Sequence, residues 1–172
     1  ADRGQRTVFN FLGPLLNPAR PTSQLIGVPT GELCEPIARV LQSLGIRRGM
    51  VVNGQVGDSA MDELSTLGEN TIAEFYQDRG FSVSRDEPGL FPLQPATLDD
   101  LKGGDAGENA ATIRAILAGE DRGPRRDAVL LNAAHALFVA ARTKSAIEGW
   151  DLAASVIDDG LAKSKLAELT DD

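Results

Sequence analysis

The first third of the chain alternates between short apolar runs and one amphipathic segment. Gln24 to Val28 is an apolar run typical of a buried strand, and Met50 to Val52 is a second one. Between them, Glu32 to Leu44 carries apolar side chains at helical spacing and is followed by Gly45, a residue that favours the end of a helix. This strand–helix–strand pattern predicts a crossover unit of a parallel sheet.

The middle of the chain mixes polar and apolar residues. Asn53 to Ser65 is polar and contains glycine, which favours a loop after the second strand. Thr71 to Tyr76 and Phe81 to Val83 have the composition of two further strands, joined near Gly80. Residues 86–97 are rich in proline and glycine and are interpreted as a connecting loop.

The last third is predicted to be mostly helical. Asp105 is a residue type typical of a helix N-cap, and Glu108 completes a capping-box pattern with it. The most apolar of these helices should be buried, because its apolar residues cover most of its faces. The predicted helices are Ala106 to Leu117, Asp127 to Ala141 (the most apolar one), Ile147 to Leu161 and Lys163 to Leu169. Together, the pattern predicts an α/β fold: part of a mainly parallel sheet flanked by helices, with a helical C-terminal third.

Composition narrows the class of protein. A length of 172 residues fits one domain or a large piece of one, and a hydrophobic content of 42% allows a sizeable core. With 17 basic and 25 acidic residues the net charge is −8, which is a poor surface for nucleic acid or for an anionic membrane. No apolar run has the length needed to span a bilayer. Neither nucleic acid nor a membrane is therefore an expected partner.

Cysteine content and the first residues bear on compartment and completeness. The single cysteine, Cys34, excludes a disulfide within the chain and a zinc site built from several thiolates. A reducing, cytoplasmic setting is the simplest interpretation. Ala1 to Arg6 has neither an initiating methionine nor the apolar region of a signal peptide, so we expect the sequence to begin part-way through a longer protein.

An acidic pair, Asp62 and Glu63, follows the second predicted strand after a polar loop. Ligands of parallel α/β folds bind beyond the carboxyl ends of the strands, and adjacent carboxylates there suit magnesium, a hard cation that takes oxygen ligands. The same segment fits a capping box of Ser59 with Asp62 at the start of a helix. By spacing alone the capping box is the commoner arrangement, and both interpretations stay open.

Three other features have a structural and a functional interpretation. Asn10 to Pro18 contains two prolines and a glycine and forms either a rigid wall for a flat ligand or a shaped turn. Gly103 to Asp105 is interpreted as a helix cap rather than a phosphate site, because Asp105 and Glu108 would oppose an anion. His135 lies among apolar residues of a predicted helix, so we expect a packed core histidine rather than a catalytic base.

One motif is long and specific enough to indicate a family. Arg6 to Ala19, with the sequence RTVFNFLGPLLNPA, resembles the signature loop of anthranilate phosphoribosyltransferases. The resemblance implies an α/β catalytic domain of the type found in nucleoside phosphorylases and this class of phosphoribosyltransferase. Further segments match the family in the same order along nearly the whole chain: Gly27-Val28, Asp62 to Ser65, Gly103 to Asp105 with Asn109 and Arg114, and Arg126 to Ala134.

The resemblance also implies an activity and a set of site residues. Enzymes of this family transfer a phosphoribosyl group from phosphoribosyl pyrophosphate to the amine of anthranilate and release pyrophosphate, a step of tryptophan biosynthesis. Mg²⁺ stabilises the departing diphosphate in such a reaction. The resemblance therefore implies that Asp62 and Glu63 coordinate Mg²⁺, in preference to the capping box. It also implies that Gly13 and Pro14 border the anthranilate site. It implies no catalytic residue within this chain.

The resemblance further implies that the site is incomplete. Residues 1–172 correspond to the C-terminal portion of the catalytic domain. The family's N-terminal helical domain, its Gly-rich phosphate-binding loop and the arginine that meets the anthranilate carboxylate all fall upstream of Ala1. We therefore expect this piece to be inactive alone, to need the missing N-terminal half as its partner, and to belong to a homodimer when complete.

Two alternatives come from other functional classes. A pyrimidine nucleoside phosphorylase-like enzyme shares the fold but uses phosphate and a base; the Asn10 to Pro18 loop argues against it, and phosphorolysis of thymidine would revive it. The second is a non-catalytic family relative that acts as a binding module. Its nucleic-acid version conflicts with the net charge of −8, and salt-dependent retention on immobilised DNA would support it.

Overall fold

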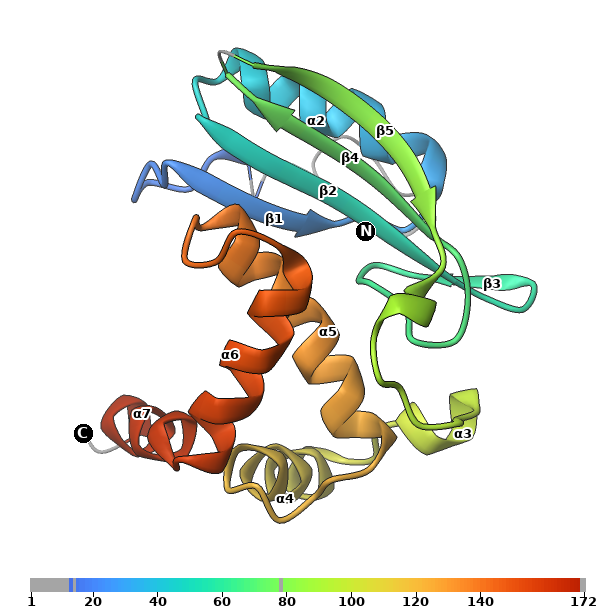
Figure 1. Cartoon of the computed structure of the whole chain (residues 1–172), viewed down its shortest axis with the longest axis vertical. Helices are drawn as coiled ribbons and strands as arrows, with labels where there is room; N and C mark the ends of the chain where they lie inside the picture. The colour runs from blue at the N-terminus through green and yellow to red at the C-terminus, as the bar shows by residue number, and fades with distance from the viewer. Residues whose placement is uncertain (1–12, 14, 78, 171–172) are drawn as a thin grey trace, which may run out of the picture.

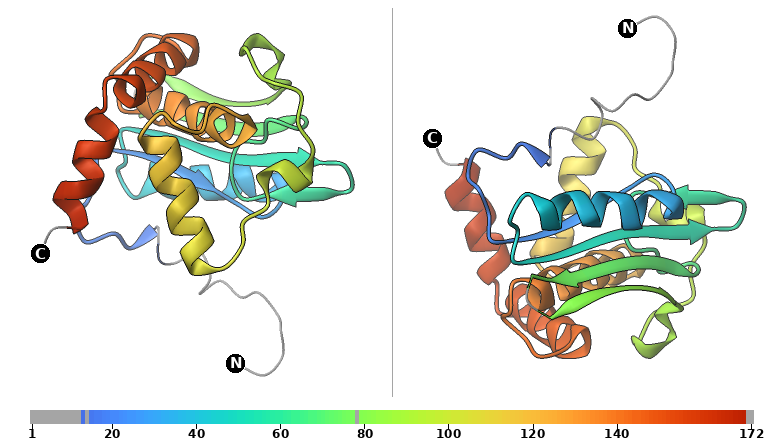
Figure 2. Two further views of the ribbon diagram at one scale, coloured as in Figure 1. Left: turned by 90° about the horizontal axis from the view of Figure 1, so that it is seen from below. Right: turned by 90° about the horizontal axis from the view of Figure 1, so that it is seen from above.

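The computed structural model describes residues 13, 15–77 and 79–170. A mixed sheet has one helix against one face and a layer of helices against the other (Figures 1 and 2). The predicted α/β class, with a sheet flanked by helices and a helical C-terminal third, is confirmed. In this part of the chain, no helix combines the length and the apolar character that a membrane crossing requires.

The predicted strand–helix–strand unit is present near the start of the described chain. β1 (Ser23–Gly27) leads through a short 3-10 helix, η1 (Gly31–Leu33), to α2 (Cys34–Ser43) and then to β2 (Arg48–Val56). β1 and β2 pair in parallel. Gly45 has a φ of +88° just after α2, and glycine takes up such a conformation without the steric penalty of a side chain, so it ends the helix as predicted.

The rest of the sheet is antiparallel, which corrects one expectation. β3 (Ser59–Met61) and β4 (Asn70–Tyr76) both pair antiparallel with β2, and β5 (Gly80–Asp86) pairs antiparallel with β4. The strand order is β1-β2-β4-β5. The prediction of a mainly parallel sheet is therefore wrong for the described strands, among which only β1 and β2 are parallel. The physical reason is that β2 to β5 follow one another without a helical crossover, and such connections favour antiparallel pairing. The polar stretch after Asn53, predicted as a loop, is partly strand.

The chain after the sheet is helical, with small shifts at the predicted ends. α5 begins at Pro124, before the apolar pattern starts, because proline is compatible with the first turn of a helix. The buried Arg126 of α5 forms a bidentate pair with Asp158 of α6, so charge as well as packing joins the two helices. The elements are η2 (Pro88–Leu90), α3 (Leu98–Leu101), α4 (Ala106–Leu117), α5 (Pro124–Val139), α6 (Ala146–Asp158) and α7 (Leu161–Thr170).

Two hydrophobic clusters lie on opposite faces of the sheet. Side chains alternate along a strand, so β2 contributes to both: Val51 faces α2, whereas Met50 and Val52 face α5 and α6. Cys34 belongs to the α2 cluster and His135 lies on α5. The sheet therefore separates the chain's single thiol from its single imidazole, and the two do not form a Cys–His pair.

Candidate functional site

Residues 61–65, which we call the acidic loop, carry the acidic pair just beyond the end of β3. Asp62 and Glu63 are exposed, whereas the two residues that follow them are buried. Ser59 lies in β3, and no described helix begins at this point, so the capping box of Ser59 with Asp62 is wrong. Neither carboxylate accepts a hydrogen bond from the described residues. Both are therefore open to a ligand outside this part of the chain.

Two buried asparagines of the sheet hold the ends of the acidic loop by its backbone. The Nδ2 of Asn53, on β2, donates to the carbonyl oxygens of Val28 (2.8 Å) and Met61 (3.0 Å). Asn70, on β4, accepts from the backbone N–H of Ser65 (2.7 Å) and donates to its carbonyl oxygen (3.0 Å). These bonds satisfy polar groups that would otherwise be costly to bury.

A third asparagine holds the middle of the loop from the helical layer. The Oδ1 of Asn132, on α5, accepts from the backbone N–H of Leu64 at 2.9 Å, and its Nδ2 donates to the carbonyl oxygen of Leu64 at 3.0 Å. The same Nδ2 also donates to the carbonyl oxygen of Ala128, one turn earlier on α5, at 3.0 Å. The amide of Asn132 is thus oriented by its own helix and matched to one peptide of the loop.

Two glycines let the acidic loop lie directly on the strands. A Cβ on Gly27, the last residue of β1, would lie 1.5 Å from the carbonyl oxygen of Asp62. A Cβ on Gly54, in β2, would lie 2.5 Å from the backbone nitrogen of Ser65. Both distances are impossible for non-bonded atoms, so only glycine permits this approach. The contact with Gly27 also places Asp62 at the carboxyl end of β1, a strand of the parallel pair β1–β2, and ligands of parallel α/β units bind at that end.

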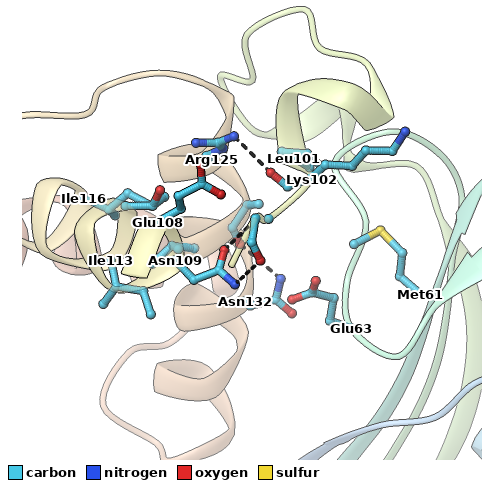
Figure 3. Close-up of a pocket in the computed structure, with 15 residues that line it drawn as sticks. Met61, Glu63, Leu101, Lys102, Glu108, Asn109, Ile113, Ile116, Arg125 and Asn132 are labelled. Carbon is cyan, nitrogen blue, oxygen red and sulfur yellow. Dashed lines mark hydrogen bonds between the residues drawn. The ribbon is translucent and has the colours of Figure 1, made fainter. Parts of the chain in front are cut away.

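Glu63 and Asn132 both line a cavity of about 700 Å³ between the acidic loop, α4 and α5 (Figure 3). The opposite wall includes Asn109, which binds the backbone N–H and carbonyl oxygen of Gly104 at 2.9 and 3.0 Å. Arg125 donates to the carbonyl oxygens of residues 100 and 102 at 2.9 and 3.0 Å and fixes the segment before α4. The acidic loop therefore faces a cavity whose other wall is also fixed by hydrogen bonds.

The electrostatics of the acidic pair suit a bound cation. The side chain of Glu63 is exposed, yet the atoms around its carboxyl group partly desolvate it and raise its pKa, and the adjacent charge of Asp62 raises this pKa further. Among the described residues, no group of three or more His, Cys, Asp or Glu side chains gathers in a way that would hold a metal. The two carboxylates offer oxygen ligands, which Mg²⁺ takes, and Mg²⁺ keeps several waters and often shares its shell with substrate phosphates. Asp62 and Glu63 therefore fit a Mg²⁺ shared with such a ligand.

The two residues predicted for the anthranilate site are only partly visible. Gly13 is exposed, and a Cβ placed on it would meet no heavy atom within 4 Å. Pro14 lies outside the described residues, as do residues 10–12 of the same motif. The role of Gly13 and Pro14 therefore stays a prediction.

Two structural interpretations from the sequence are confirmed. Asp105 accepts from the backbone N–H of Glu108, and Glu108 accepts from that of Asp105, both at 2.9 Å, so the carboxylates cap α4. His135 is 8% exposed and its Nδ1 lies 2.8 Å from the carbonyl oxygen of Leu131. Burial lowers its pKa, which keeps the imidazole neutral, as expected of a core histidine.

The three asparagines that hold the acidic loop were not predicted from the sequence. Asn132 entered only as part of a longer family match, and Asn53 only as the start of a predicted loop. A signal was present, because both follow apolar runs, Met50 to Val52 and Leu130-Leu131. An amide at the end of a buried run must find hydrogen-bond partners. The loop partner of Asn132, Leu64, is 68 positions away, so the pattern alone does not identify it.

Known proteins resemble this chain over nearly its whole length. A family model described as "Glycosyl transferase family, a/b domain" matches residues 2–163. The anthranilate phosphoribosyltransferase of Geobacter sulfurreducens is 49% identical over 166 residues, which are 96% of this chain and 46% of that protein. The enzyme of the same name from Lacticaseibacillus paracasei is 48% identical over 168 residues, 96% of this chain and 47% of that one.

Solved structures give the same picture. Anthranilate phosphoribosyltransferase from Thermus thermophilus superimposes with a TM-score of 0.81 at 41% identity, covering 96% of this chain and 47% of that one. The Saccharomyces cerevisiae enzyme in complex with PRPP and Mg has a TM-score of 0.85 at 28% identity, covering 98% and 47%. The chain thus spans about half the length of the relatives that it matches.

Proposed function

The chain belongs to the glycosyl transferase family with this a/b domain, and from that premise we propose that it is the magnesium-binding half of an anthranilate phosphoribosyltransferase. The proposed reaction moves the phosphoribosyl group of phosphoribosyl pyrophosphate to the amine of anthranilate and releases pyrophosphate, in tryptophan biosynthesis. The names of relatives that are 49% and 48% identical support this assignment.

The observation that carries the metal role is the construction of the acidic loop. Its backbone is fixed by Asn53, Asn70 and Asn132, while the carboxylates of Asp62 and Glu63 have no partner among the described residues. A relative of the same name was solved with PRPP and Mg, which is the ligand chemistry that two free carboxylates suit. In this proposal Asp62 and Glu63 share the coordination of Mg²⁺ with the diphosphate.

The chain's own residues then act mainly by position. When bound, Mg²⁺ would offset the negative charge that develops on the diphosphate as the bond to the anomeric carbon breaks. Asp62 and Glu63 hold that position, and the three asparagines limit how far the loop moves. Gly13 and Pro14 border the anthranilate in this scheme. The phosphate-binding loop, the arginine for the anthranilate carboxylate and the helical domain belong to the upstream half.

Assembly and location complete the proposal. The complete enzyme is a homodimer in this scheme, and the 172-residue piece alone is inactive because the substrate contacts of the upstream half are missing. The enzyme works in the cytoplasm, in keeping with a single cysteine that is free and buried in the structure.

The test follows the loss of anthranilate fluorescence with phosphoribosyl pyrophosphate and Mg²⁺, using the complete natural polypeptide. The test variant carries Asp62→Asn with Glu63→Gln. The control variant carries Asp58→Asn with Glu87→Gln, which removes the same two charges from exposed positions outside the acidic loop. We expect about a 100-fold or greater loss of rate for the test variant, because ligands of an essential metal are removed, and little change for the control.

Three outcomes would overturn parts of this proposal. A natural protein that leaves anthranilate untouched but cleaves thymidine with phosphate is a nucleoside phosphorylase. Equal rates for the test and control variants would remove the metal role of Asp62 and Glu63. Turnover by residues 1–172 alone would remove the claim that this piece is only half of the active unit.

A further inference from the structure

The bonds of Asn132 link the helical layer to the residue that follows Glu63. Its amide pairs with both polar groups of Leu64, and Leu64 itself is 1% exposed. The other two loop contacts of this kind come from strands, through Asn53 on β2 and Asn70 on β4. Asn132 is therefore placed to fix the loop relative to α5 rather than relative to the sheet.

The orientation of Asn132 is also fixed. Its Nδ2 is shared between Leu64 and Ala128, so rotating the amide would break a bond to its own helix as well as two bonds to the loop. An amide side chain offers an acceptor and a donor side by side without a change of protonation, which this geometry uses. Moreover, Asn132 and Glu63 line the same cavity (Figure 3).

We propose that Asn132 is a positioning residue for the metal function of the acidic loop. By holding the Leu64 peptide, it keeps Glu63 turned into the cavity between the loop, α4 and α5, where the Mg²⁺–diphosphate would be shared. This inference rests on the proposed function and assigns Asn132 a role through Glu63, without contact with the metal. Residues that orient metal ligands in this way change metal affinity about 10- to 100-fold when they are replaced.

The experiment measures Mn²⁺ binding to the complete natural polypeptide by the electron paramagnetic resonance signal of free Mn²⁺, without substrates. Asn132→Ala removes all three bonds, and Asn132→Ser, a milder change, keeps a shorter hydroxyl that reaches at most part of them. Val139→Ala is the matched control, because it opens space at a buried position of the same helix and removes no hydrogen bond of the acidic loop. Asp62→Asn with Glu63→Gln identifies the Mn²⁺ bound at the acidic pair.

We expect about a 10-fold weaker Mn²⁺ affinity for Asn132→Ala, a smaller loss for Asn132→Ser and no change for Val139→Ala. Hydrogen exchange of the Leu64 amide should become faster in both Asn132 variants only, because that amide is bonded to Asn132. In the anthranilate assay, the Mg²⁺ concentration for half-maximal rate should rise in the same order.

The outcomes separate this inference from the proposed function. Faster exchange at Leu64 with unchanged Mn²⁺ affinity, or a loss no larger than that of Val139→Ala, would show that Asn132 is only structural. A natural protein whose reaction rate and Mg²⁺ requirement do not change when Asp62 and Glu63 are replaced would overturn the metal role itself. A protein that binds Mn²⁺ through Asn132 and the acidic pair but does not consume anthranilate would leave the positioning role standing and overturn the substrate.

Discussion

Two acidic pairs each contribute one glutamate, Glu63 or Glu108, to the lining of the same cavity, and the two pairs have opposite roles. Asp105 and Glu108 accept hydrogen bonds from each other's backbone N–H groups, so their carboxylates stabilise the first turn of α4. In the acidic loop the backbone is held by asparagine side chains, and the carboxylates of Asp62 and Glu63 accept no bond from the described residues. The carboxylates of Asp105 and Glu108 therefore stabilise the fold, whereas the fold holds Asp62 and Glu63 in place through their backbone.

The difference teaches where to look for function in a sequence rich in acids. A carboxylate near the start of a helix gains from the exposed N–H groups and the helix dipole. Two adjacent carboxylates on a fixed loop repel each other, and the pKa of Glu63 is raised by partial desolvation and, secondarily, by this repulsion. A local arrangement that opposes stability, held by buried groups, is typical of a binding site.

The largest expected effect comes from replacing the glycine that contacts each acidic pair, Gly27 for the acidic loop and Gly104 for the cap of α4. Gly27→Ala places a Cβ 1.5 Å from the carbonyl oxygen of Asp62, a backbone atom that cannot rotate away. We expect a loss of about 3 kcal/mol in the free energy of unfolding, measured with denaturant, and loss of Mn²⁺ binding. Gly104→Ala meets the Oε2 of Glu108 at 1.8 Å, the end of a flexible side chain, so about 1 kcal/mol is expected.

The control for the glycine variants is Gly89→Ala, because a Cβ at Gly89 meets no heavy atom within 4 Å. Its stability should stay within about 0.5 kcal/mol of the natural protein. If Gly27→Ala is as stable as Gly89→Ala, the acidic loop does not rest on β1 as described.

A second test removes one asparagine of the sheet. Asn53→Ala leaves the carbonyl oxygens of Val28 and Met61 without their donor, and Asn53 itself is fully buried. We expect a loss of about 2 kcal/mol in unfolding free energy. Asn17→Ala is the matched control, since Asn17 also bonds to the backbone, where its Oδ1 accepts from the N–H of Ala19, but at an exposed position. Equal losses for the two variants would contradict the claim that burial makes the loop contacts important.

A third test concerns the other acidic pair. Asp105→Ala removes the N-cap of α4 and should lower the unfolding free energy by about 1 kcal/mol, while Mn²⁺ affinity stays unchanged. Asp105→Asn should be nearly neutral, because asparagine is an equally good N-cap. A fall in Mn²⁺ affinity for Asp105→Ala would mean that the two acidic pairs are not separate in function.

The smallest expected effect is a pH dependence of the unfolding free energy. It should arise from His135 on α5 and should not involve the hydrogen bonds that hold the acidic loop. Burial lowers the folded-state pKa of His135, so the unfolded state takes up a proton more readily. The stability that neutral His135 permits is complete above the unfolded pKa of about 6.5 and is lost as the pH falls below it. In His135→Gln, the unfolding free energy should depend less on pH in this window. Hydrogen exchange of the Leu64 amide, which is bonded to the uncharged Asn132, should change with pH only as far as global stability changes. Since the chain has one histidine, an unchanged profile in His135→Gln would assign the dependence to carboxylates.

Much of the fold followed from the sequence where a single periodicity governed a segment. Helical spacing predicted α2, and residue type and spacing at Asp105 and Glu108 predicted the cap of α4. The antiparallel part of the sheet was missed because β3 and the end of β2 are polar, with Gln55 and Ser59 on strands that lack an apolar signal. Whether neighbouring strands run parallel or antiparallel depends on the length of the connection between them. The polar stretch after Asn53 concealed where β2 ends and β3 begins, so this length could not be read from the sequence.

The candidate site was only half predictable for a different reason. Adjacent carboxylates at Asp62 and Glu63 were visible at once, but spacing favoured a helix cap, and only the family resemblance reversed that preference. What decides between the two is the set of groups that hold the backbone. Leu64 and Asn132 are 68 positions apart, so no local pattern relates them.

Because asparagine side chains hold the acidic loop, the site can be damaged over time by deamidation. Asn53 is followed by Gly54, and an asparagine before glycine is the arrangement most prone to deamidation, because the small residue lets the next backbone nitrogen attack the side chain. In the folded protein, burial and the bonds of Nδ2 to Val28 and Met61 oppose that attack. Each unfolding event exposes the pair, and conversion to aspartate replaces a donor by a charged acceptor. Heat or age would therefore damage this protein at the support of its acidic loop.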